Sequence, residues 1–165
     1  MFKKTRYIDT LAGLIIICCF SCHSATKEQA QNMSAALLTI NDSVSFKGRE
    51  LGKCISMALR DKDYSRIGPL RQQYQDYIDS CGRAVKHMND VGGSEQMRRA
   101  ELAVLGFEKT MVQNDLVMFE KLKPESTPSE ISVLFQIGNK DAKKEADFIA
   151  KFKEIQQEYA KKNGF

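Results

Sequence analysis

The unusual chemical feature of this chain is a pair of carboxylates, Asp141 and Glu145, close to the apolar positions of a helical stretch. A buried carboxylate is costly unless it is paired. Two interpretations stay open. The apolar stripe drifts here and both groups face water in i,i+4 pairs, or both form, with Asn114, a polar notch between helices for a basic or hydroxylated ligand. Asn114 also fits a polar residue that fixes the packing register of a helix seam.

The histidines give no metal or catalytic site. His23 and His87 both lack the Glu three residues earlier that di-metal carboxylate bundles use. His87 stands near a predicted helix end, where the helix dipole favours a cation. The sequence contains no phosphate-binding glycine loop. It therefore predicts a protein that is not an enzyme and that carries no metal or cofactor.

Three of the five cysteines stand between residues 18 and 22, which leaves Cys54 and Cys81 in the body of the chain. An exported protein can form a disulfide. With a turn near residues 61–68, however, Cys81 would lie about 9 Å along the helix axis from the position opposite Cys54. A disulfide needs Cα atoms within about 7 Å. A bridge between Cys54 and Cys81 is therefore the less favoured alternative to two free thiols on helix seams.

Helices must position these side chains, because apolar residues recur at spacings of three and four through four stretches. The stretches cover about 26–60, 67–88, 94–122 and 128–162. Capping boxes at Thr26 with Gln29 and at Thr127 with Glu130 mark two starts. The predicted stripe of the third stretch is Met97, Ala100, Val104, Phe107, Met111, Met118 and Leu122. A second apolar row widens it and consists of Leu102, Leu105, Val112, Leu116 and Phe119. The predicted stripe of the fourth stretch is Ile131, Leu134 or Phe135, Gly138, Ala142, Phe148, Phe152, Ile155 and Tyr159.

Four amphipathic stretches with short connections predict an all-α fold, an up-down-up-down antiparallel four-helix bundle. No stretch of useful length alternates with period two. The predicted mature part, residues 22–165, suits one domain. It holds 22 basic and 20 acidic residues once the three basic residues and one acidic residue of 1–21 are removed from totals of 25 and 21. This balance argues against a nucleic-acid partner.

The first 21 residues are typical of an export signal, with Lys3, Lys4 and Arg6 before an apolar block at 11–20 and small residues after it. The block is shorter than the roughly 20 apolar residues of a membrane span, and a permanent transmembrane anchor is the less favoured alternative. Cleavage after residue 24 or 25 would instead release a soluble protein.

The stretch Cys19-Phe20-Ser21-Cys22 resembles a bacterial lipoprotein box, since the small Ser21 precedes Cys22. Cys19 departs from the usual Leu of that box. The resemblance implies removal of 1–21 and acylation of Cys22 by fatty acids such as palmitate. More than one acyl chain gives stable membrane anchoring.

Near the C-terminus the chain carries Phe148-x-x-x-Phe152, Gln156-Gln157 and the closing YAKKNGF. With these features it resembles small bacterial surface lipoproteins of unassigned function. The resemblance implies a helical bundle, a non-enzymatic role and a lipid-anchored place in the bacterial cell envelope, at the outer membrane or surface rather than free in the periplasm.

Two functions follow. The first is an envelope-anchored protein-interaction module, which presents exposed apolar residues such as Phe46 and Tyr77 to an envelope or surface protein. The alternative is a periplasmic binder of a small ligand or cofactor, with its site between helices near Asn114, Asp141 and Glu145.

Overall fold

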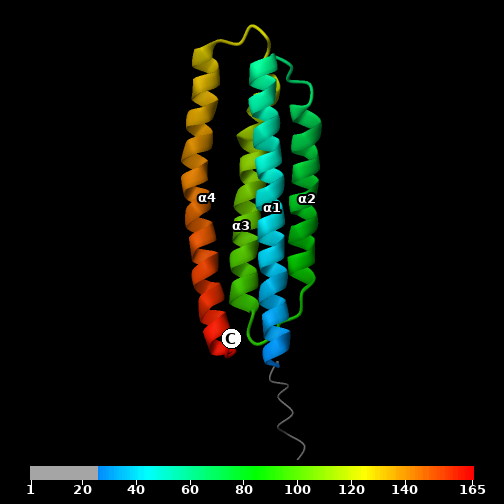
Figure 1. Cartoon of the computed structure of the whole chain (residues 1–165), viewed down its shortest axis with the longest axis vertical. Helices are drawn as coiled ribbons and strands as arrows, with labels where there is room; N and C mark the ends of the chain where they lie inside the picture. The colour runs from blue at the N-terminus through cyan, green and yellow to red at the C-terminus, as the bar shows by residue number, and fades with distance from the viewer. Residues whose placement is uncertain (1–25) are drawn as a thin grey trace, which may run out of the picture.

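The computed structural model describes residues 26–165. The predicted signal segment 1–21 and the predicted acylation site Cys22 lie outside the described residues. The described part is an antiparallel bundle without strands (Figure 1). Its elements are α1 (Lys27–Asp61), α2 (Ile67–His87), α3 (Glu95–Asn114), the 3-10 helix η1 (Leu116–Lys121) and α4 (Pro128–Lys162). The predicted all-α, up-down-up-down four-helix bundle is confirmed.

Both predicted capping boxes are present and set where α1 and α4 begin. The Gln29 amide donates to Thr26 Oγ1 at 3.2 Å, and the Thr26 amide donates to Gln29 Oε1 at 3.0 Å. At α4 the Glu130 amide donates to Thr127 Oγ1 at 3.3 Å, and the Thr127 amide donates to Glu130 Oε2 at 2.7 Å. Pro128 occupies the first turn, where its missing N–H costs least.

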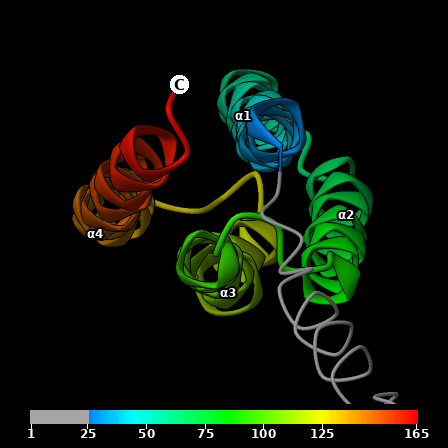
Figure 2. The ribbon, with the colours of Figure 1, turned by 90° about the horizontal axis from the view of Figure 1, so that it is seen from below.

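The four helices are not evenly packed. α2 packs extensively on α1 and on α3, and α3 packs extensively on α4, whereas α1 and α4 meet at few positions. The end-on view shows α1 and α4 as neighbours with space between them (Figure 2). Towards the lower end of Figure 1, Gln156 Nε2 joins α4 to α1 by donating to Ser34 Oγ at 3.0 Å. The bundle is therefore tightly closed along three seams and loosely closed along the fourth.

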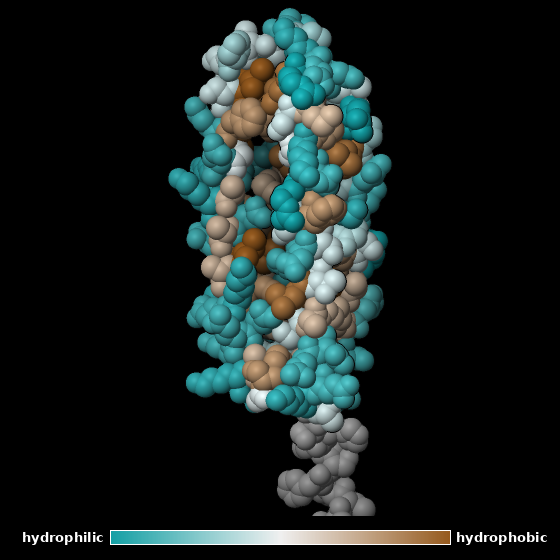
Figure 3. Space-filling view, in the orientation of Figure 1, coloured by the Kyte–Doolittle hydropathy of each residue, from teal (hydrophilic) through white to brown (hydrophobic). Residues whose placement is uncertain are grey.

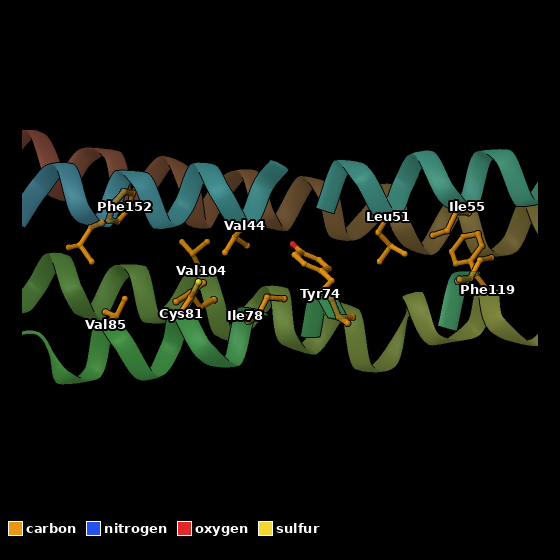
Figure 4. Close-up of a cluster of buried hydrophobic side chains, with 14 of the residues drawn as sticks. Val44, Leu51, Ile55, Tyr74, Ile78, Cys81, Val85, Val104, Phe119 and Phe152 are labelled. Carbon is orange, nitrogen blue, oxygen red and sulfur yellow. The ribbon is translucent and has the colours of Figure 1, made fainter. Parts of the chain in front are cut away.

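One hydrophobic core runs the length of the bundle (Figure 4). Leu51, Ile67 and Phe152 are among its largest fully buried side chains. Burying an aliphatic or aromatic side chain of this size contributes about 1.5–3 kcal/mol. Within residues 26–165, no helix has both the length and the apolar character needed to pass through a membrane.

The buried row of α3 contains Met97 and Val104 of the predicted stripe, together with Leu105 and Val112 of the predicted second row. Its members are Met97, Glu101, Val104, Leu105, Glu108 and Val112. The sequence prediction placed Ala100, Phe107 and Met111 on this row, which is wrong because the row that faces the core contains two glutamates. Because glutamate is charged, Glu101 and Glu108 did not count as core positions in the prediction, although they continue the row at spacings of four and three.

The predicted third helix was also too long. α3 ends at Asn114, and the chain continues as η1, with three residues per turn instead of 3.6. In this winding the Phe119 side chain enters the core, while the Glu120 carboxylate forms an ion pair with Arg71 on α2. Contacts with neighbouring helices therefore replace the regular helix that the sequence periodicity predicts.

The lower end of α4 is fastened to the turn between α2 and α3. The Tyr159 hydroxyl donates to the Val91 carbonyl at 2.7 Å, and Asn163 Nδ2 donates to the Gly92 carbonyl at 3.3 Å. Gly92 has φ of +60°, and a Cβ there would lie 2.4 Å from Asn163 Oδ1. Glycine is therefore required both by the backbone conformation and by the close approach of the C-terminal end.

Candidate functional site

The open seam between α1 and α4 contains a cleft of about 450 Å³ in the upper half of the bundle. Figure 3 shows the furrow between these helices, with apolar residues in its depth. The cleft has an apolar wall drawn from α1, α3, η1 and α4, and this wall consists of Leu51, Ile55, Met111, Leu116 and Ile149. Every helix of the bundle contributes to the lining, because Tyr74 reaches it from α2.

The polar end of the cleft consists of Tyr74, Glu108 and Glu145, from three different helices. The Tyr74 hydroxyl donates to Glu108 Oε2 at 2.8 Å, and the Glu108 side chain is buried, at 3% exposure. The pKa of Glu108 is raised to about 8, mainly by burial and further by the hydrogen bond and the negative charge of the Glu145 carboxyl. Near neutral pH, the Glu108 carboxyl group therefore keeps its proton beside Glu145.

Gly48 on α1 makes room for the tyrosine that completes this group. A Cβ at position 48 would lie 3.0 Å from the Tyr74 hydroxyl oxygen. Figure 4 shows the Tyr74 ring in the core, with its oxygen towards α1. Burial raises the pKa of Tyr74 well above its usual value, and the negative charge of Glu108 adds to the effect. Tyr74 is thus a neutral hydrogen-bond donor at every physiological pH.

A second carboxyl pair joins α3 and α4 closer to the upper connection. Asp141 is buried, at 6% exposure, and Lys144 Nζ lies 2.8 Å from its Oδ1 atom. The hydrogen bond from Lys144 lowers the pKa of Asp141 below its ordinary value. Burial and the hydrogen bond with Asp141 raise the pKa of Asp115. Lys144 forms an ion pair with this second carboxyl pair, whereas within residues 26–165 the structure gives no ion pair to Glu108 or Glu145.

The predicted ligand residues therefore separate into three environments. Glu145 lines the cleft, and Asp141 belongs to the second carboxyl pair. Asn114 is exposed at the last turn of α3, so its predicted place on the seam is wrong. The adjacent Asp115 faces Asp141 on α4 instead. For Asp141, the interpretation that it faces water is also wrong, because its side chain is almost fully buried.

Sequence analysis missed Glu101 and Glu108, and it placed Tyr74 only as a core residue. A signal was present, because Glu101 and Glu108 are seven residues apart and occupy the gaps of a heptad row otherwise made of apolar residues. Glu101 is fully buried, and Asn41 Nδ2 donates to its Oε2 atom at 3.5 Å. Its Oε1 atom has no hydrogen-bond partner. Burial raises the pKa of Glu101 to about 7, partly offset by Asn41.

Cys54 and Cys81 are free thiols, half-buried and buried respectively. Burial raises the pKa of the Cys81 thiol, which keeps it protonated and unreactive. Among the residues that the structure describes, no three His, Cys, Asp or Glu side chains come together in a way that could hold a metal ion.

The groups of the cleft are suited to binding. Carboxyl oxygens accept hydrogen bonds and compensate positive charge, and Tyr74 supplies a fixed donor. Arg49, which is exposed, is the one basic residue among those that line the cleft. The lining contains no histidine or cysteine to act as nucleophile or base. Comparisons with protein families, with curated proteins and with solved structures found no match to this chain.

Proposed function

We propose that this protein is a non-enzymatic binding protein of the bacterial cell envelope that receives a small ligand in the cleft between α1 and α4. The observation that carries the proposal is the convergence of Tyr74, Glu108 and Glu145 at the end of an otherwise apolar cleft. Binding sites for small molecules are commonly cavities of about 300–1,000 Å³, mostly apolar, with a few convergent polar groups. Titratable groups with displaced pKa values often mark such sites.

The envelope location rests on the sequence. Lys3, Lys4 and Arg6 precede a short apolar block, and Ser21 precedes Cys22 as in a lipoprotein box. Acylation of Cys22 would tie the bundle to a membrane, and the resemblance to small surface lipoproteins supports the outer membrane or the cell surface.

The test uses the full chain extracted from the membranes of the cells that make it. Native mass spectrometry should detect a bound small molecule, and intact mass should detect acylated Cys22. Gly52 lines the cleft, and a Cβ added there meets no atom within 4 Å. Gly52→Phe should therefore fill the cleft and remove the bound mass.

Gly106→Phe is the matched control, because Gly106 is an exposed helical glycine with equally open surroundings and does not line the cleft. This variant should keep the bound mass. A native preparation without any bound molecule, or one in which both variants retain it, would count against a ligand in the cleft.

The protein-interaction module is the second candidate, and exposed apolar side chains favour it. Met57, Val133 and Phe135 are exposed near the upper end, where α1 ends and α4 begins, and Phe46 is exposed on α1. The predicted contact Tyr77 is half-buried, with Lys47 Nζ 4.7 Å from its ring centre. For this candidate, crosslinking in intact cells should capture a defined envelope protein with the wild type and with Gly52→Phe. The Val133→Ser, Phe135→Ser double variant should no longer capture that protein. The reverse result would assign the activity to the cleft.

A further inference from the structure

We infer that the ligand of the cleft is an organic cation, whose protonated amine lies between Glu108 and Glu145 and whose apolar body packs against Leu51, Ile55 and Ile149. This inference rests on the proposed function, because it names the chemical class of the ligand for the same cleft.

Glu108 and Glu145 have no ion-pair partner within residues 26–165, whereas other acidic residues do, such as Glu120 with Arg71 and Asp141 with Lys144. If Glu108 ionises, only the Tyr74 hydroxyl offsets the desolvation cost of its buried carboxylate, and a cation would offset more of it. An ammonium group carries three donors and one positive charge, which suits two facing carboxyl groups.

The chain does not fill the cleft itself. Gly48 and Gly52 are two of the α1 residues that line it, and Gly52 has open space where a side chain would stand. A ligand that carried only an ammonium group would leave the apolar wall in water. Burial of apolar area on that wall adds roughly 25 cal/mol per Å², so an amine with a hydrocarbon or aromatic body fits better than a bare cation.

The charged groups around Glu108 decide how the site responds to pH. Glu145 faces it from α4, Tyr74 from α2 and the exposed Arg49 lines the cleft from α1. Tyr74 stays neutral, and the repulsion of a cation by Arg49 is weakened because its charge is in water. An arriving ammonium group stabilises the ionised form of Glu108. Glu108 therefore releases its proton in part to solvent on binding, and amine affinity should rise between pH 6 and pH 8.

The experiment is isothermal titration calorimetry of the full chain in detergent, with 2-phenylethylamine as probe and 2-phenylethanol as its neutral analogue. We expect the amine to bind at least tenfold more tightly, since hydrogen bonds to charged groups contribute about 1.5–3 kcal/mol. At pH 7, buffers with different ionisation enthalpies should give different observed heats, which measures the released proton.

Glu108→Gln should remove the preference for the amine. If that variant does not fold, Glu145→Gln provides the test, and it should weaken the preference. Glu101→Gln is the matched control, because Glu101 is a buried acid on the same face of α3 that does not line the cleft. It should keep the full preference. Gly52→Phe should abolish binding of both probes.

The failures are distinguishable. Equal binding of amine and alcohol, unchanged by Glu108→Gln, would overturn the cation assignment and leave the cleft as a ligand site. Binding of neither probe, or binding that survives Gly52→Phe, would also overturn it. The proposed function itself fails only if the native preparation carries no molecule in the cleft.

Discussion

Glu101 and Glu108 occupy equivalent positions in two levels of the bundle, two turns apart on the same face of α3. At the lower level Asn41 of α1 contacts Glu101, and at the upper level the corresponding α1 position, seven residues later, is Gly48. The lower glutamate is sealed within the core, while the upper one ends in a cleft beside Tyr74 and Glu145.

The comparison shows how one residue converts a packed level of the bundle into one that opens to a cleft. The Asn41 side chain fills the space beside α3, but Gly48 leaves it free for the Tyr74 hydroxyl. A buried acid alone is a stability cost, as at Glu101. A buried acid with a donor, a second carboxyl and an opening can serve a ligand, as at Glu108. The following predictions test this difference.

The largest expected effect is the pH dependence of the wild-type protein. The pKa values of Glu101 and Glu108 are raised in the folded state to about 7 and about 8. Both groups keep their protons in the folded state over a range where the unfolded chain releases them, so stability is greatest near pH 5 and falls as pH rises to 8. Each unit of difference corresponds to about 1.4 kcal/mol, which gives a total of several kcal/mol. Urea unfolding at pH 5, 6.5 and 8 measures this loss of stability. Constant stability over this range would contradict the raised pKa values of both glutamates.

Glu101→Gln should remove the share of the pH-dependent loss of stability that comes from ionisation of Glu101. At pH 8 we expect the variant to be more stable than wild type by about 2 kcal/mol, because it has no buried charge, although one amide group stays imperfectly paired. At pH 5 the difference should nearly vanish. Urea unfolding again measures it, with the exposed Glu125→Gln as control. A gain that is equal at both pH values would point to packing instead of charge.

Tyr74→Phe should destabilise the upper level by about 1–2 kcal/mol, because it removes the 2.8 Å hydrogen bond to Glu108 and leaves a buried acceptor unpaired. Thermal unfolding followed by circular dichroism measures the loss. Tyr64→Phe, at a half-buried tyrosine against the core, provides the comparison and should have a smaller effect. Equal losses would show that the Tyr74 hydroxyl contributes no special contact.

The smallest effect distinguishes the two glycines of the cleft. Gly52→Ala should stabilise the protein by up to about 1 kcal/mol through helix propensity, since the added Cβ meets no atom within 4 Å. Gly48→Ala should gain less or lose, because its Cβ would lie 3.0 Å from the Tyr74 hydroxyl oxygen. Identical gains at both positions, measured by urea unfolding, would mean that Tyr74 moves aside freely.

Much of the fold was predictable from local signals. The capping boxes at Thr26 and Thr127 are short-range chemistry, and the structure keeps both. The apolar periodicity was sufficient for four antiparallel helices because each helix needs only one face against its neighbours. The end of α3 was not predictable in this way, since Arg71 on another helix pairs with Glu120 and Phe119 enters the shared core.

The cleft was harder to predict, because its buried polar side chains are stabilised only by contacts with residues distant in the sequence. Glu108 is tolerable in the core through Tyr74, which is 34 residues earlier in the chain. A search for apolar periodicity excludes charged residues from a stripe, and the prediction therefore left out Glu101 and Glu108 and placed Phe107 and Met111 on the buried row of α3. It also selected Asn114 where the structure uses Asp115.

Both Thr26 and the C-terminus lie at the lower end of the bundle, whereas the cleft opens on its flank (Figure 1). At 1.5 Å per residue, Gly48 and Gly52 stand about 35 Å above Thr26 along α1. If a membrane faces the lower end of the bundle, as the proposed acylation of Cys22 would favour, the lower half of the protein would separate the cleft from that membrane. A ligand would then reach the cleft from the side.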